Sequence, residues 1–239
     1  MRILKVILFT VGISSLFIYL NCSATYTTPT DKDLLTGRFN YRTHPEFIKL
    51  PSQYSTKEIY LRKVVYEHFK AMADSAAKSG IVLKALSGTR SFAEQKAIWD
   101  NKWTKYFTNG DSIGAMKKIL LYSSMPSTSR HHWGTDIDIN SLEPSYFASG
   151  KGLKEYTWLV NNASRFGFCQ VYDDMKKTGR TGYQEEKWHW SYLPVATKLL
   201  VEYHSKISYA EISGFKGSNL ASKINFIPSF VDGISTKCK

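Results

Sequence analysis

The chain has 239 residues, of which 43% are hydrophobic, 14% aromatic and 22% charged. This length and composition suit one globular domain with a full core and exclude a disordered chain or a repeat array. The formal net charge is +12, which favours an anionic partner such as a cell wall or a membrane surface. The basic residues are scattered and carry no nucleic-acid-binding signature, so we expect no nucleic-acid partner.

The N-terminus predicts export. Residues 1–5 are cationic and residues 6–20 form an apolar run, which is shorter than the roughly twenty residues of a membrane span. We therefore interpret residues 1–21 as a signal peptide. Cys22 stands where a bacterial lipoprotein carries its lipid, although Asn21 replaces the small residue usual before that Cys. A plain signal peptide and an uncleaved anchor are the alternatives, and each places the protein in the cell envelope, in the periplasm or on the outer surface.

Composition divides the remaining chain into three parts. Residues 22–33 are polar and Thr-rich and contain Pro29, which is typical of a linker. Residues 34–203 carry the periodic apolar segments and are expected to form the main domain. Residues 204–239 are expected to be a C-terminal extension packed on it, with an apolar segment at residues 224–231.

Helical and extended patterns alternate in the first half of the main domain. Gly80 is positioned to end the first helix, and Ser91 and Glu94 have the spacing of a capping box at the start of the second. In chain order we predict an irregular entry segment, a helix, a strand and a second helix at residues 34–50, 54–79, 81–87 and 92–106.

In the second half, the alternation of residues 135–140 predicts a strand with Asp136 and Asp138 on one face. We expect that polar face to line a cleft. The other predicted elements are a short helix at residues 116–122, helices at 154–166 and 194–203, and strands at 168–172 and 188–192. Because helices and strands mix without regular βαβ spacing, we predict an α+β fold with a mainly antiparallel central sheet flanked by helices.

Two separated segments contain the residue types of a catalytic zinc site. His131 and Asp138 lie in the first, and Glu186 and His189 lie in the second. A catalytic zinc takes three protein ligands, leaves a fourth position open and needs a nearby base. We therefore predict one Zn²⁺ bound by the two His and the Asp, with Glu186 accepting a proton from the attacking water.

Each of these assignments has an alternative. His132 is a rival ligand, and Glu185 is a rival base. The spacing to His189 favours Glu186, but strict strand alternation would place these two side chains on opposite faces. Glu186 must therefore lie at a bend just before the strand. In the non-functional interpretation, these histidines and acidic residues are ordinary surface residues.

Arg90 follows the first predicted strand. A guanidinium there can bind a carboxylate with two hydrogen bonds or stabilise an oxyanion, and a solvated surface Arg is the alternative.

Besides Cys22, the chain contains two further cysteines, Cys169 and Cys238. They can form one disulfide in an exported protein, but the sequence leaves their pairing open.

These motifs resemble the VanY-like D-alanyl-D-alanine carboxypeptidases, a zinc metallopeptidase family related to VanX-type dipeptidases and to the hedgehog signalling domain. The family pattern is S-x-H-x-x-G-x-[AD]-x-D followed by E-x-W-H, with an upstream S-G-x-R-S and a Gln. The resemblance spans roughly residues 35–235. The chain matches the pattern at Ser129, His131, Gly134, Asp136 and Asp138, at Glu186, Trp188 and His189, and at Ser87, Gly88, Arg90, Ser91 and Gln95.

The resemblance implies a hedgehog/D-Ala-D-Ala-peptidase fold, with zinc bound by His131, Asp138 and His189. It also makes Glu186 the catalytic base and assigns Arg90 to the substrate or the transition state. It further implies that Arg90, Gln95 and Ser129 contact the substrate. Asp136 and Trp188 are then expected to lie behind the metal ligands and support them.

The activity that the resemblance implies is removal of the terminal D-amino acid from peptidoglycan stem peptides. Closely related alternatives are an L,D-carboxypeptidase, a D,D-dipeptidase and an endopeptidase that cuts cross-links. A zinc-containing binding module without catalysis is an alternative of another class, although the presence of Glu186 argues against it. A basic wall-anchoring or nucleic-acid-binding protein without zinc is a third alternative. We expect a monomer.

Overall fold

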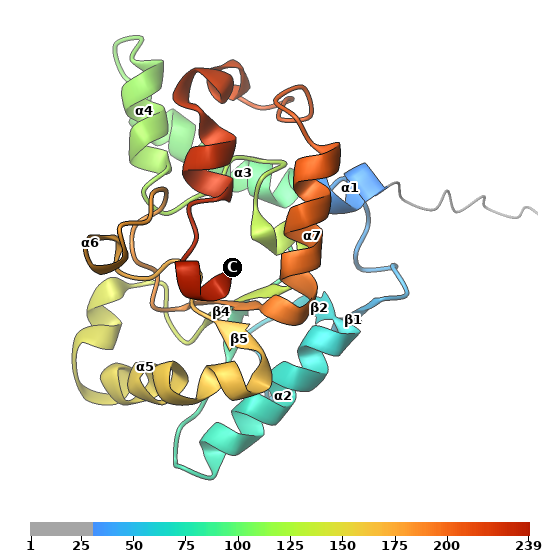
Figure 1. The fold of residues 1–239 in the computed structure, drawn as a ribbon, viewed down its shortest axis with the longest axis vertical. Coiled ribbons are helices and arrows are strands. Elements are labelled where there is room, and N and C mark those ends of the chain that lie inside the picture. The colour runs from blue at the N-terminus through green and yellow to red at the C-terminus, as the bar shows by residue number, and fades with distance from the viewer. Residues whose placement is uncertain (1–30) are drawn as a thin grey trace, which may run out of the picture.

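The structure, a computed structural model, describes residues 31–239 (Figure 1). The predicted signal peptide, Cys22 and residues 22–30 of the predicted linker lie outside the described residues. The first described element is helix α1, Asp31–Thr36. Within residues 31–239, no helix has both the length and the apolar character to cross a membrane.

A four-stranded antiparallel sheet forms the centre of the fold, in the order β3-β4-β6-β5. A separate pair of antiparallel strands, β1 with β2, lies beside it. This arrangement confirms the α+β class with a mainly antiparallel sheet. The strands are β1 Phe47–Lys49, β2 Tyr60–Arg62, β3 Ala85–Ser87, β4 Asp136–Ile139, β5 Phe168–Cys169 and β6 His189–Tyr192.

Helices cover the sheet on two sides. In Figure 1, α2 and α5 lie on one side of the strands, and α3, α4 and α7 lie on the other. The other α-helices are α2 Lys63–Ala77, α3 Phe92–Tyr106, α4 Ser112–Ile119, α5 Gly150–Asn162, the single turn α6 Met175–Thr178, and α7 Leu193–Lys206. The short helical turns are η1 Arg130–Trp133, η2 Pro144–Ala148, η3 Ala163–Phe166, η4 Ser218–Leu220, η5 Ser222–Ile224, η6 Ile227–Val231 and η7 Thr236–Cys238.

Local signals set the start of α3 but not the start of α2. The Ser91 hydroxyl accepts from the Glu94 N–H and the Glu94 carboxylate accepts from the Ser91 N–H, so the predicted capping box is present. By contrast, the helix predicted from residue 54 begins only at Lys63. Residues 60–62 pair with residues 47–49 instead, inside the segment predicted to be irregular.

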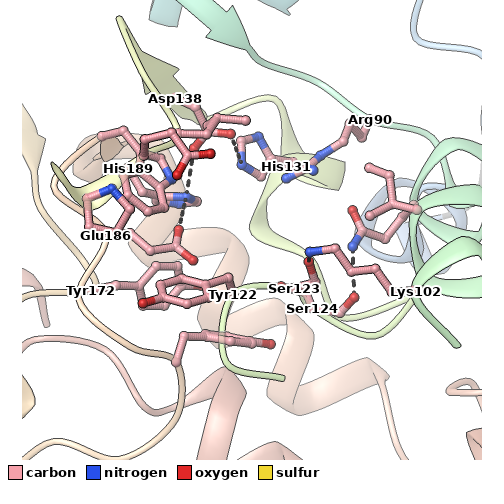
Figure 2. A pocket seen from close by; sticks show the side chains of 17 residues that line it. Arg90, Lys102, Tyr122, Ser123, Ser124, His131, Asp138, Tyr172, Glu186 and His189 are labelled. Atoms are coloured by element: carbon pink, nitrogen blue, oxygen red, sulfur yellow. Dashed lines mark hydrogen bonds and ion pairs between the residues drawn. The ribbon is translucent and has the colours of Figure 1, made fainter. Parts of the chain in front are cut away.

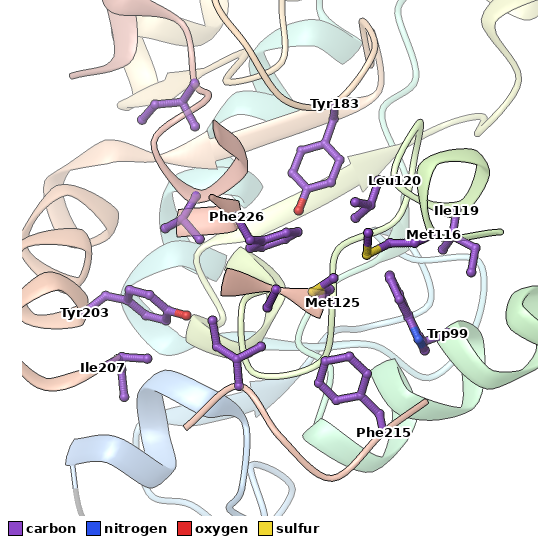
Figure 3. Packing of buried hydrophobic residues seen from close by; sticks show 14 of the residues in the cluster. Trp99, Met116, Ile119, Leu120, Met125, Tyr183, Tyr203, Ile207, Phe215 and Phe226 are labelled. Atoms are coloured by element: carbon purple, nitrogen blue, oxygen red, sulfur yellow. The ribbon is translucent and has the colours of Figure 1, made fainter. Parts of the chain in front are cut away.

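Two hydrophobic clusters hold the layers together. One lies among α2, α5 and the sheet and includes Ile137 and Trp190. The other lies among α3, α4 and α7 and includes Trp99. Residues 204–239 contribute to this second cluster, and the ring of Phe215 lies edge-on to Trp99 (Figure 3). Because β6 alternates, Trp190 faces the first cluster while His189 faces the opposite side.

A disulfide between Cys169 and Cys238 joins the C-terminal residues to β5. The backbone supports the same connection, because the Ser235 N–H donates to the Val171 carbonyl at 2.8 Å. The pairing that the sequence left open is therefore present in the structure.

Candidate metal centre and active-site pocket

Three buried side chains converge on one point of the sheet (Figure 2). His131 comes from η1, Asp138 from β4 and His189 from β6, and β4 pairs with β6 so that Asp138 lies opposite His189. One ligand atom from each of the three lies within 4.8 Å of the others. The structure therefore brings together the three residues that the sequence predicts as metal ligands.

A left-handed turn at Gly134 places His131 beside the strand that follows it. Gly134 ends η1 with φ of 69°, a conformation in which a Cβ is disfavoured. Close packing adds a second reason for glycine, since a Cβ here would lie 2.4 Å from the Phe47 ring. The turn lets the chain enter β4 directly, which puts His131 and Asp138 on the same side of the sheet.

The His131 ring presents Nε2 to the cluster. Its Nδ1 lies 2.7 Å from the Gly88 carbonyl oxygen, which can only accept, so Nδ1 carries the proton. His131 Nε2 and Asp138 Oδ1 are both buried without a hydrogen bond. Buried polar atoms normally have a partner. Two unpartnered lone-pair atoms facing one point fit a divalent cation, and imidazole with carboxylate suits Zn²⁺.

The His189 ring lies between two carboxylates of β4. Its Nε2 is 2.8 Å from Asp136 Oδ2, so the Nε2–H donates to Asp136. Its Nδ1 faces the cluster, 3.2 Å from Asp138 Oδ1 and 3.4 Å from Glu186 Oε2. His189 therefore presents Nδ1, and His131 presents Nε2, to the same site.

Asp136 is held in place by its own contacts. Its Oδ1 accepts from Thr135 Oγ1 at 2.6 Å and from Ser191 Oγ at 2.8 Å, and Arg130 Nε donates to its Oδ2 at 3.0 Å. Burial alone would raise the pKa of Asp136, but the Arg130 charge and the bond from His189 outweigh it and lower the pKa. An ionised Asp136 behind His189 fixes the ring orientation.

Glu186 lies at a bend immediately before β6. The His189 N–H donates to the Glu186 carbonyl at 3.2 Å and closes a turn, which places the Glu186 carboxylate on the same side as the His189 ring. Burial raises the pKa of the Glu186 carboxyl and makes it a stronger base. Glu185, the rival base, instead lies 3.9 Å from Lys187 Nζ and outside the pocket lining.

His132 points away from the metal cluster. Its Nδ1 lies 2.7 Å from the Arg90 carbonyl oxygen, and its ring packs so closely on Gly37 that a Cβ there would meet it at 2.3 Å. Burial lowers the pKa of His132 to about 3, so the ring is neutral. The alternative that made His132 a metal ligand is therefore wrong for this structure.

A pocket of about 580 Å³ opens beside the cluster. Arg90, Gln95 and Trp188, all singled out from the sequence, line it. Ser129 does not: its hydroxyl is buried without a hydrogen bond, and its role in substrate binding stays a prediction. The lining also includes residues that sequence reasoning missed, namely Lys102, Tyr122, Ser123, Ser124, Tyr172 and Tyr183.

Of the residues missed, only Lys102 had a usable signal. It lies seven residues after Gln95 on α3, and that spacing places both on one helix face. The serines and tyrosines come from loops whose neighbours are set by tertiary packing.

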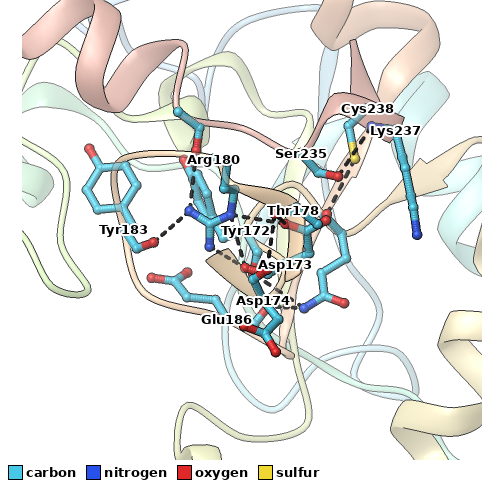
Figure 4. A network of polar contacts seen from close by, with 12 residues as sticks. Tyr172, Asp173, Asp174, Thr178, Arg180, Tyr183, Glu186, Ser235, Lys237 and Cys238 are labelled. Atoms are coloured by element: carbon cyan, nitrogen blue, oxygen red, sulfur yellow. Dashed lines mark hydrogen bonds and ion pairs between the residues drawn. The ribbon is translucent and has the colours of Figure 1, made fainter. Parts of the chain in front are cut away.

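Arg180 holds the loop that leads to Glu186 (Figure 4). Its buried guanidinium donates to the backbone carbonyls of Asp173, Tyr183 and Gln184 and forms an ion pair with the Asp173 carboxylate at 3.1 Å. One side chain therefore ties together both ends of the segment 173–184.

Comparison with known proteins agrees with this geometry. The family model described as VanY, D-alanyl-D-alanine carboxypeptidase, matches residues 58–195. A D-alanyl-D-alanine carboxypeptidase of Enterococcus faecalis is 31% identical over 147 residues, which are 60% of this chain and 52% of that protein. The chain spans about half the length of the first curated relatives that it matches.

Two solved structures share the fold. The LdcB LD-carboxypeptidase is 25% identical with a TM-score of 0.52, over 72% of this chain and 81% of that one. VanYB in complex with D-alanine-D-alanine is 25% identical with a TM-score of 0.50, over 71% and 93%. These likenesses confirm the fold type expected from the sequence.

Proposed function

The chain belongs to the VanY family of D-alanyl-D-alanine carboxypeptidases, and on that premise we propose that it is a zinc-dependent carboxypeptidase of peptidoglycan stem peptides. The observation that carries the proposal is the convergence of His131, Asp138 and His189, with the Glu186 carboxylate 3.4 Å from His189 Nδ1. Three ligands, an acidic neighbour and an adjacent pocket meet the needs of metal-assisted peptide hydrolysis.

The metal and the protein divide the chemistry. Zn²⁺ bound by the three ligands would supply a Lewis acid that polarises the scissile carbonyl and lowers the pKa of water. Glu186 accepts the proton of the attacking water and returns it to the departing amine. Asp136 keeps the proton of His189 on Nε2, which leaves Nδ1 free to bind metal. The Arg90 guanidinium stabilises negative charge on the substrate.

The substrate we propose is a stem peptide that ends in a D-amino acid. The likeness to VanYB, solved with D-alanine-D-alanine, supports a D,D bond as the target. The likeness to the LdcB LD-carboxypeptidase supports a second candidate, an L,D-carboxypeptidase with the same site. The signal-peptide pattern of residues 1–21 and the net charge of +12 support action in the cell envelope, against an anionic wall or membrane surface.

Release of D-amino acid from defined peptides tests the proposal. The purified protein, loaded with zinc, is incubated with a pentapeptide stem ending in D-Ala-D-Ala and with the matching tetrapeptide stem. We expect release from the pentapeptide and loss of release with a chelator. Glu186→Gln should lower kcat roughly 10²- to 10⁴-fold while the zinc content per chain is unchanged.

The possible results separate the candidates. Release only from the tetrapeptide would support the L,D-carboxypeptidase. Bound zinc without release from any stem peptide would overturn the enzyme and favour a binding module. Purified protein that fails to bind zinc would overturn the metal centre.

A further inference from the structure

The pocket adjoins a second cavity at Asp138, one of the predicted metal ligands. The second cavity shares Arg90, Ile98, Asp138 and Leu142 with the first. Beyond these shared residues the second cavity is lined by Tyr41, Arg42, Lys57 and Tyr60, and the first by Lys102, Ser123 and Tyr183. A peptide lying across Asp138 therefore has one cavity for its terminal residue and another for the rest of its length.

Lys102 supplies a cation in the first cavity. Gln95, Ile98 and Lys102 line the pocket from one face of α3. Lys102 Nζ donates to Ser123 Oγ at 2.6 Å. Among residues 31–239, no carboxylate forms an ion pair with it, and its side chain is partly buried. Burial lowers the pKa of the ammonium, and the charge of Glu186 partly opposes this shift. A partly desolvated cation whose side-chain hydrogen bond goes to a neutral hydroxyl is a receptor for an anion.

The surroundings hold this ammonium in position. The Ser123 N–H donates to the Ile119 carbonyl at 3.1 Å, which fixes Ser123 at the end of α4. The neighbouring Ser124 carbonyl accepts from Gln95 Nε2 at 2.8 Å. Helix α3 and the loop of residues 123–124 are thus tied together at Gln95 and at Lys102. A preformed site of this kind binds a ligand with less loss of conformational entropy.

Arg90 occupies a different place in the pocket. Its N–H donates to the His131 carbonyl at 3.1 Å, so it is anchored directly at a predicted metal ligand (Figure 2). In Figure 2 the Arg90 side chain lies beside His131. Arg90 Nε is buried without a hydrogen bond. Its charge acts at the reacting end of the pocket, whereas Lys102 lies on the wall that Ser123 and Ser124 form.

We propose that Lys102, supported by Ser123, binds the free C-terminal carboxylate of the substrate, and that Arg90 acts at the scissile carbonyl. This inference rests on the proposed carboxypeptidase function. The terminal carboxylate and the scissile carbonyl belong to consecutive residues, roughly 4 Å apart along the chain. Lys102 and Arg90 line the same pocket and offer one cation to each of these two oxygen-bearing groups. In this role Lys102 distinguishes a free chain end from an internal peptide bond.

A pair of peptides that differ only at the C-terminus tests this role. The same stem peptide is prepared with a free carboxylate and with a carboxamide, and kcat/KM is measured for each. We expect Lys102→Met to lower kcat/KM for the acid about 10- to 100-fold, mainly through KM, and to leave the amide within about 3-fold. Lys102→Arg should retain part of the preference for the acid. Lys105→Met, an exposed lysine of the same helix, is the matched control and should behave as wild type.

Several results would overturn the inference. The inference is wrong if Lys102→Met keeps the wild-type ratio of kcat/KM for the acid to kcat/KM for the amide. If Arg90→Met instead loses the preference for the acid, the carboxylate is bound by Arg90. If Lys102→Met does not fold, Ser123→Ala supplies the test, because it must weaken binding of the acid but not of the amide. If zinc-loaded wild type cleaves no peptide, the proposed function fails separately, and calorimetric binding of the two peptides to wild type and to Lys102→Met decides the role of Lys102.

Discussion

The two nitrogens of His189 face two different carboxylate environments. Nε2 donates to Asp136, which is surrounded by donors and has no open lone pair toward the pocket. Nδ1 faces Asp138 and Glu186 at the predicted metal site. Because Asp136 fixes which nitrogen carries the proton, the residue behind the ligand controls how well the ligand binds metal.

Asp136→Asn should therefore weaken zinc binding about 10- to 100-fold. An amide can present its NH₂ to His189 Nε2 and favour the wrong tautomer, and it also removes the charge that pairs with Arg130. Competition with a chelating dye, well below the unfolding temperature, measures the affinity. Asp232→Asn is the control, because Asp232 also accepts from a histidine, the exposed His204, and neither residue lines the pocket. Equal zinc affinity in both variants would contradict the role of Asp136.

His131 and His132 are neighbours with opposite expected effects. His131→Gln should abolish stoichiometric zinc binding. His132→Leu should keep one zinc per chain and lower the free energy of unfolding by about 1–3 kcal/mol, because the partly buried Arg90 carbonyl loses its donor. Metal analysis and urea unfolding of both variants measure the two quantities. Loss of zinc from a folded His132→Leu protein would show that His132 contributes to metal binding.

The ligand types and their spacing were readable in the sequence, but the choice between adjacent histidines was not. The residue chemistry of His131, Asp138, Glu186 and His189 indicates a metal site from the sequence alone. Which histidine of the pair faces that site depends on the η1 turn. Lys102 shares a helix face with Gln95, but that spacing alone did not single it out, since one lysine among 32 basic residues looks like solvated surface until helix packing places it in a pocket.

At the scale of elements, the segment that carries Glu186 depends on one buried side chain. Apart from the four residues of α6, residues 173–186 form no regular helix or strand, and Arg180 supplies the hydrogen bonds that backbone pairing would otherwise provide. The bend at Glu186 comes immediately after this segment. The Glu186 N–H donates to the Tyr172 carbonyl at 2.9 Å. The position of the base is thus a property of this loop rather than of the sheet.

Arg180→Met should lower the free energy of unfolding by about 3 kcal/mol, because it leaves buried carbonyls and Asp173 without their donor. We also expect kcat to fall more than zinc content, since the three ligands lie on other elements. Urea unfolding, metal analysis and peptide release measure these effects. Arg165→Met is the control, because the exposed Arg165 donates to the Asn162 side chain three residues away and does not hold the segment that carries Glu186. A folded Arg180→Met protein with wild-type kcat would contradict the positioning role.

Element boundaries were predictable where the signal was local. The capping box at Ser91 set the start of α3, because both of its hydrogen bonds connect residues three apart. The start of α2 could not be read in the same way. Residues 54–62 have apolar positions compatible with a helix, but Tyr60–Arg62 pairs with a strand thirteen residues earlier in the chain. Pairing between distant segments overrides local spacing.

At the scale of the whole molecule, the C-terminal residues complete the core beneath the pocket. Phe226 and Val231 are buried in the cluster that contains Tyr183, a residue of the pocket wall. The Phe230 ring packs edge-on against Tyr183 at 5.2 Å between centroids. The apolar segment at residues 224–231 indicated some packing contact, but only the folded chain shows that this contact supports the wall opposite α3.

The Cys169–Cys238 disulfide ties this C-terminal packing to the sheet, and Cys238→Ser tests its contribution. The bridge closes a loop with a sequence separation of 69, which the chain-entropy model values at about 4 kcal/mol. We expect the variant to melt about 10 °C lower than the oxidised wild type. A reductant should lower the Tm of the wild type to that of the variant and leave the variant unchanged. Equal Tm values for oxidised wild type and Cys238→Ser would mean that the noncovalent contacts of residues 204–239 hold the C-terminus without the bridge.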